Sequence, residues 1–129
     1  MRFLVDTHTF LWAILSPEKL TDRVRNIFMD RGTELLVSIA TPWEMAIKAG
    51  IGKLVNGAEV LDNFENLLAA GGYRMLETST RQVIASGSLP LYHKDPFDRL
   101  LIAQAFDLNV PILSSDEILD RYGVIRIWK

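Results

Sequence analysis

Short apolar runs alternate along the chain with stretches in which apolar residues recur every three or four positions. The first run, 2–5, contains β-compatible residues, and the stretch that follows it has Phe10, Leu11, Ile14 and Leu15 at helical spacing. The same alternation of the two patterns continues to the end of the chain. It predicts strands over 2–5, 35–37, 73–76, 110–113 and 124–128.

The expected helices are bounded by capping residues, prolines and glycines. Thr41 is followed by Pro42 and, three residues after Thr41, by an acid; Asp95 is followed by Pro96 in the same arrangement, which is typical of a helix start. Gly71 and Gly72 close another helical stretch. Helices are therefore predicted over 7–15, about 20–32, 42–50, 60–68, 80–86, 96–108 and 117–121, with a loop over 87–94.

Strands that alternate with helices pair in parallel through right-handed crossovers. The sequence thus predicts an α/β fold, a three-layer α/β/α sandwich with a central, mainly parallel sheet. Because the sequence contains neither an internal repeat nor a linker-like stretch, we expect one domain over 1–129.

Composition narrows the function classes. The 129 residues are 49% hydrophobic and include no cysteine, which excludes disulfide scaffolds and thiolate metal sites. No run approaches the roughly 20 apolar residues that cross a bilayer, so we expect a cytoplasmic protein without a membrane partner. The formal net charge of −2 argues at first against binding nucleic acid through phosphates alone.

Four acids fall where predicted strands pass into helices. Asp6 ends the first strand, Glu44 and Asp98 open helices, and Asp116 follows the fourth strand by three residues. Ligands of open α/β sheets bind outside the carboxyl ends of the strands, so the predicted topology brings these acids to one rim. Crowded carboxylates repel each other unless a cation neutralises them, and oxygen ligands favour Mg²⁺ or Mn²⁺. Such an ion suits phosphodiester hydrolysis.

Each acid also has a purely structural interpretation. Glu44 and Asp98 occupy the third positions of helices capped by Thr41 and Asp95, where an acid favours the helix dipole. Asp116 is a possible cap of the short helix after it, and Asp95 is best placed as a cap, with an accessory metal or water-ordering role second. Asp6, at the end of a buried strand, is the hardest to explain by structure alone.

Other chemically active side chains give weaker evidence of function. His8 and His93 lack ligand spacing to another histidine, which favours a hydrogen-bonding or core-edge position over a catalytic one. Trp12 and Trp43 stand at helical spacing and are expected in the core rather than as base-stacking platforms. Arg99 is expected to contact a phosphate or to pair with a neighbouring acid, and the sequence does not decide between the two.

In combination, these residues resemble the PIN-domain ribonucleases, and in particular the VapC-type toxins of toxin–antitoxin pairs. The resemblance runs from end to end of the chain. It rests on Asp6-Thr7-His8 with Leu11-Trp12, on Ser38 and Trp43-Glu44, on Gly52-Lys53-Leu54, on His93 to Arg99 followed by Ile102-Ala103-Gln104-Ala105, and on Ser114-Ser115-Asp116 with Tyr122 and Trp128.

The resemblance implies that Asp6, Glu44, Asp98 and Asp116 form an acidic quartet that binds Mg²⁺, with Mn²⁺ as a substitute, and cleaves RNA. Ser114 stands where a threonine is common and keeps a hydroxyl for a supporting hydrogen bond.

Two partners are implied as well: a second copy in a homodimer and a cognate antitoxin that lies across the active-site groove. Candidate contact residues on apolar surface are Phe28, Phe64 and Trp128. Pro42, at a position where the family often has another apolar residue, only stiffens the start of a helix.

Competing interpretations fit less well. A receiver domain needs a phosphoacceptor aspartate after the third strand, where this chain has Glu77-Thr78-Ser79, and a haloacid-dehalogenase-type phosphatase needs an aspartate where this chain has His8. A catalytically silent PIN domain that only binds RNA or a partner remains the main alternative.

The charge balance changes once a metal site is assumed. Setting four of the 16 acids aside leaves 14 basic against 12 acidic residues, so the remaining surface is mildly positive. Lys48, Lys53 and Lys94, together with Arg99, are the basic side chains expected at the rim, and RNA binding is expected to depend strongly on the metal.

Overall fold

The computed structural model describes residues 1–54 and 56–129. Five strands form one sheet in the order β3-β2-β1-β4-β5, and every neighbouring pair is parallel. Their bounds are β1 Arg2–Val5, β2 Glu34–Ser38, β3 Tyr73–Leu76, β4 Ile112–Leu113 and β5 Arg126–Ile127. The α/β fold with a parallel central sheet is therefore confirmed.

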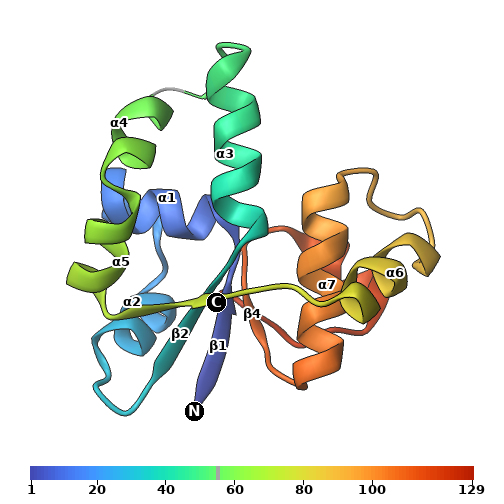
Figure 1. Cartoon of the computed structure of the whole chain (residues 1–129). Coiled ribbons are helices and arrows are strands. Elements are labelled where there is room, and N and C mark those ends of the chain that lie inside the picture. Colours follow the sequence, from blue (N-terminus) through green and yellow to red (C-terminus); the bar gives the residue numbers. More distant parts are fainter. Residues whose placement is uncertain (55) are drawn as a thin grey trace.

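Helices pack on both faces of the sheet (Figure 1). Along the chain they are α1 Thr7–Leu15, α2 Asp22–Met29, α3 Ala40–Gly50, α4 Gly57–Asp62, α5 Phe64–Gly71, α6 Thr80–Ser88 and α7 Pro96–Leu108, with 3₁₀ turns η1 Pro17–Lys19 and η2 Glu117–Tyr122. In Figure 1, α1, α2, α4 and α5 lie on one side of the strands and α6 and α7 on the other, while α3 rises from the end of β2.

Alternating strand residues divide the core between the two faces, because successive side chains of a strand point in opposite directions. Phe3 and Val5 belong to the larger cluster, which includes Phe10 of α1 and Met45 of α3. Leu4 belongs to a second cluster, whose other buried members are Leu36, Leu101, Ile102, Ala105, Val110, Ile112 and Leu119. None of the helices in the described part of the chain is long and apolar enough to cross a membrane.

Several of the predicted helices differ from the observed ones in their bounds or type. The helix expected over 60–68 is two helices, because Asn63 interrupts it and its side chain donates to the Glu59 carbonyl oxygen at 3.1 Å. An asparagine that bonds nearby backbone competes with the helix ladder. The helix expected over 80–86 continues to Ser88, and so shortens the predicted loop.

The predicted start of α3 is wrong. Thr41 is not the cap; the helix begins at Ala40, whose N–H donates to the Ser38 hydroxyl at 3.1 Å. Thr41 is fully buried and its hydroxyl lies 3.2 Å from that of Thr7, so it ties α3 to the start of α1. Pro42 is tolerated in the first turn, because N–H groups there have no partner within the helix.

Candidate metal centre

The four acids singled out from the sequence lie at the carboxyl ends of the strands. Asp6 follows β1 and precedes α1, Glu44 lies on α3, Asp98 lies in the first turn of α7, and Asp116 lies between β4 and η2. β1 is central, with β2 on one side and β4 on the other, so the segments after these three strands meet at one edge. This edge is the upper end of the sheet in Figure 1, opposite the chain's N-terminus.

Helix capping holds three aspartates of this edge in place. One oxygen of Asp6 accepts from the Thr9 N–H at 2.8 Å, and one oxygen of Asp116 accepts from the Ile118 N–H at 3.1 Å. Asp95 caps α7 as predicted, accepting from the N–H groups of Phe97 and Asp98 at 2.8 and 3.4 Å. In each case the capping uses one oxygen, so the structural and functional interpretations of Asp6 and Asp116 are compatible.

Glu44 has no capping role to explain it. It is in the second turn of α3, only 1% exposed, and its Oε2 accepts from the Lys48 ammonium. The other oxygen, Oε1, is buried without a hydrogen-bond partner among the described residues. A buried carboxylate oxygen without a partner is costly unless something else binds it, and a cation would do so.

Two of the acids have raised pKa values, both through burial and one also through the charges of neighbouring acids. Burial, followed by the charges of Asp95, Glu44, Asp6 and Asp116, raises the pKa of Asp98 to about 8. Burial also raises the pKa of Asp6, although hydrogen bonds from Ser114 and Thr9 oppose the rise. Repulsion among these carboxylates is the condition that a divalent cation relieves.

His93 lies between two of the acids, in the kind of hydrogen-bonding position that the sequence favoured, although its partners were not predicted. Its Nε2 is 2.9 Å from Oδ2 of Asp116 and 3.1 Å from Oδ2 of Asp98, and its Nδ1 accepts from the Asp95 N–H at 3.2 Å. Because Nδ1 accepts this hydrogen bond, the ring N–H on Nε2 is the one that faces the carboxylates. The sequence carries no local signal for this contact, because it depends on how the loop before α7 folds back onto the acids.

Among the described residues, only His93, Asp98 and Asp116 offer ligand atoms that all lie within 4.8 Å of one another. Asp6 and Glu44 are outside this tight group, but both lie near enough to raise the pKa of Asp98. The carboxylate oxygens of Asp98 and Asp116, with the unpartnered Glu44 oxygen, fit a divalent cation and suit Mg²⁺ or Mn²⁺, while His93 holds the two aspartates.

A buried arginine fixes the loop that carries His93. Arg99 is 7% exposed and donates to the backbone carbonyl oxygens of Ser86, Leu89 and Pro90 at 2.9, 2.8 and 2.9 Å. It also donates to the His93 carbonyl oxygen at 3.3 Å. Among the described residues Arg99 forms no ion pair with an acid, so the predicted pairing is not observed; its guanidinium binds backbone carbonyl oxygens inside the protein instead.

Tyr122 and Ser114 support the same region. The Tyr122 hydroxyl donates to the Pro90 carbonyl oxygen at 2.6 Å and accepts from the His93 N–H at 2.8 Å. Ser114 is fully buried, and its Oγ accepts from the Asp116 N–H at 3.1 Å. Ser114 also acts on Asp6: its hydroxyl lowers the pKa of the Asp6 carboxyl and so opposes the effect of burial.

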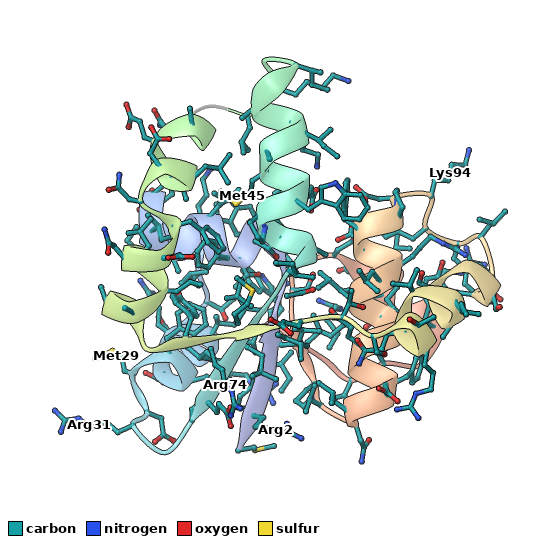
Figure 2. The ribbon with its side chains drawn as sticks, viewed as in Figure 1. Arg2, Met29, Arg31, Met45, Arg74 and Lys94 are labelled. Atoms are coloured by element: carbon teal, nitrogen blue, oxygen red, sulfur yellow. The ribbon has the colours of Figure 1, made fainter. Side chains whose placement is uncertain are left out.

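The three predicted rim lysines occupy different positions. Lys48 and Lys53 line a hollow of about 280 Å³ that also includes Glu44. Burial opposes the charge of Lys48, but the Glu44 carboxylate outweighs that effect and raises the Lys48 pKa. Lys94 is exposed just before α7 and points away from the body of the protein (Figure 2).

The apolar candidates differ from expectation. Phe64 is 8% exposed and belongs to the core, while Phe28 and Trp128 are half-buried against it. Trp43, expected in the core, is 56% exposed and packs edge-on against Phe97 with ring centroids 4.8 Å apart.

Comparisons with known proteins agree with this architecture. The family model of the PIN domain matches residues 3–125. A search of curated proteins found no match. Among solved structures, VapBC2 from Rickettsia felis, bound to a DNA fragment from its promoter, superposes with a TM-score of 0.72 at 14% identity, covering 100% of both chains.

Two further structures are similar. VapBC-1 from nontypeable Haemophilus influenzae has a TM-score of 0.69 at 16% identity and covers 98% of this chain and 97% of its own. FitAB bound to a DNA fragment has a TM-score of 0.64 at 17% identity, with coverage of 97% and 93%. The chain belongs to the PIN domain family, whose members are generally nucleases.

Proposed function

We propose that this protein is a metal-dependent endoribonuclease toxin that a cognate antitoxin inhibits. The observation that carries the proposal is the edge where Asp98 and Asp116 meet His93 beside the unpartnered oxygen of Glu44. Membership of the PIN domain family supports nuclease chemistry, and the likeness to VapBC structures supports the toxin branch.

Asp6, Asp98 and Glu44 would hold the principal ion directly or through water, and Asp116 would complete the site. A divalent cation bound there would polarise the phosphate, favour ionisation of the attacking water and stabilise the departing oxygen. Hydrolysis adds water across one P–O bond: the attacking oxygen joins phosphorus in line, the O3′–P bond breaks, and O3′ takes up a proton. The products carry a 5′-phosphate and a 3′-hydroxyl.

The surrounding residues would align these carboxylates. The cap contacts of Asp6 and Asp116 fix one oxygen of each, and Ser114 holds the Asp116 backbone. Lys48 would balance the charge of Glu44 and, with Lys53 and Lys94, would attract the phosphates of RNA. Asp95 would remain a cap that adds negative charge beside Asp98.

Partner binding would involve apolar surface near the site. Trp43 and Ile47 on α3, and Ile51 just after its end, recur every four residues and are 56%, 44% and 61% exposed. We expect such surface to be covered by the antitoxin or by the second copy of a homodimer. An arginine or lysine of the antitoxin that reached the acids would inhibit by taking the place of the cation.

The test compares purified wild type, Asp6→Asn and Asp98→Asn on a structured RNA with Mg²⁺, with Mn²⁺ or with EDTA. We expect cleavage only with metal and a loss of at least about a hundredfold in each variant. Asp62→Asn is the matched control, because Asp62 is exposed on α4, outside the acidic edge.

Equal cleavage in all samples would overturn the proposal, since it would indicate a contaminating nuclease. Metal and RNA binding without cleavage by the wild type would favour the alternative of a catalytically silent binding domain. A chemical analysis of the product ends is a second check, because a 2′,3′-cyclic phosphate would contradict attack by water.

A further inference from the structure

Two hollows adjoin along α1 and open beside the acidic edge. The first, of about 280 Å³, is lined by Thr7, Glu44, Lys48 and Lys53; the second, of about 430 Å³, is lined by Trp12 and Lys19 among others. They share the lining residues His8, Leu11 and Leu54, so the two hollows adjoin, and together they are here called the α1 groove.

We propose that the α1 groove is the path along which single-stranded RNA leaves the acidic edge, with lysines on its phosphates and the rings of His8 and Trp12 against its bases. This inference rests on the proposed function, because cleavage inside an RNA strand requires that the strand continue past the reacting phosphate. The groove meets the acidic edge at Glu44 and Lys48.

The charge of the groove suits a polyanion. Three lysines line it, and among its described lining residues Glu44 is the one acid, already paired with Lys48. Lys19 and Lys53 are exposed, and in the described part of the chain neither has an acidic partner within 4.0 Å. Their charges remain available to a ligand.

Aromatic rings line the same path. His8 is exposed at the start of α1, and its ring centroid lies 6.0 Å from that of the half-buried Trp12, one helical turn further on. The ring centroids of Trp12 and Trp128 are 5.7 Å apart. The Lys19 ammonium is also 5.7 Å from the centre of the Trp12 ring. Rings interleaved with lysines bind unpaired bases of any sequence, whereas bases inside a duplex offer no free face to stack on.

The experiment measures binding of a short fluorescent single-stranded RNA by anisotropy, in the Asp98→Asn background so that the RNA stays intact. Lys19→Ala/Lys53→Ala is compared with Arg2→Ala/Arg31→Ala, which removes the same charge. Arg2 and Arg31 lie at the opposite end of the protein (Figure 2). We expect the lysine variant to reduce the slope of log affinity against log salt by about 1.4, and the arginine variant to leave it unchanged.

The aromatic half is tested with His8→Ala and Trp12→Leu, each expected to weaken binding about fivefold or more. Because Trp12 packs against the core, a thermal melt checks that the Trp12→Leu variant is folded. If it is not, His8→Ala still tests the aromatic half, because His8 is exposed. Single-stranded RNA should bind more tightly than a duplex of equal length.

Unchanged affinity and salt slope in the lysine and His8 variants would overturn the inference. So would variants that weaken binding of an antitoxin segment and leave RNA binding intact, because the groove would then hold protein. These results are distinguishable from failure of the proposed function: if the wild type cleaves RNA while the groove variants bind it normally, the nuclease assignment stands and the α1 groove assignment is wrong.

Discussion

The two walls of the acidic edge are built differently. On the α7 side, Arg99 and Tyr122 bind the backbone of the loop before α7 and hold His93 against the aspartates. On the α3 side, the lysines and His8 border open hollows, and Trp43 is exposed. In Figure 1, α3 rises from the upper end of the sheet, while α7 lies beside the strands.

This contrast indicates that the two walls have different functions. A metal site needs ligands held within fractions of an ångström, which the backbone contacts of Arg99 provide. A surface that accepts RNA strands of different sequence needs charge and free rings instead. Variants of Arg99, His93 and Tyr122 on the α7 side should therefore affect folding and metal binding, whereas variants of the exposed lysines and His8 on the α3 side should affect RNA binding.

Among single substitutions, the largest effect on stability is expected from Arg99→Met. Removing the guanidinium leaves several carbonyl oxygens of the loop without a donor, and we expect a loss of about 3 kcal/mol in the free energy of unfolding. Urea denaturation measures it. Arg81→Met is the matched control, since Arg81 is 79% exposed and its ion pair with Asp107 contributes little. A normal urea midpoint for Arg99→Met would show that the loop does not depend on it.

His93→Ala should weaken metal binding. The imidazole orients Asp98 and Asp116, and the loss of such a supporting group typically costs about 10- to 100-fold in metal affinity. Isothermal calorimetry with Mn²⁺ measures it without any RNA. His8→Ala, on the α3 side, should bind Mn²⁺ as the wild type does; equal losses in the two variants would remove the distinction between the walls.

Stability without metal should fall as the pH rises. The pKa of Asp98 is raised from 3.8 to about 8, so in this interval the folded state keeps a proton that the unfolded state releases. Each unit of pH then costs up to about 1.4 kcal/mol, and the raised pKa of Asp6 acts in the same direction. Urea midpoints in EDTA measure the slope, and Asp98→Asn should flatten it. A slope that Asp98→Asn leaves unchanged would contradict the assignment.

The smallest effect is expected from Tyr122→Phe. The lost hydroxyl leaves the His93 N–H and the Pro90 carbonyl oxygen without their partner. We expect the free energy of unfolding to fall by about 1 kcal/mol. Tyr92→Phe is the control. The Tyr92 ring contacts Tyr122 and Arg121, and phenylalanine keeps that ring. If both variants melt alike, the Tyr122 hydroxyl does not secure the loop.

The features that could be predicted from the sequence are those that depend on local pattern. The alternation of strands and helices was sufficient for the fold and for placing Asp6, Glu44, Asp98 and Asp116 at one edge, because that edge follows from parallel pairing. The cap motif was right at Asp95 and wrong at Thr41, where a contact with Thr7, 34 residues away, takes the hydroxyl that capping would use.

What local pattern could not predict are the long-range contacts. Arg99 is not a surface charge because the carbonyl groups of a neighbouring loop converge on it, and His93 joins the acids because that loop folds back. Neither arrangement has a fixed spacing in sequence. The exposure of Trp43 likewise depends on how α3 stands relative to α7.

The most direct test of the metal centre is a thermal melt with and without millimolar Mg²⁺ or Mn²⁺, on wild type and Asp98→Asn. A ligand that binds only the folded state raises its apparent stability, by about 2.7 kcal/mol at a hundred times the dissociation constant. We expect a clear rise in the melting temperature of the wild type and almost none in Asp98→Asn. No shift in the wild type, or an equal shift in both, would contradict a metal centre at this edge.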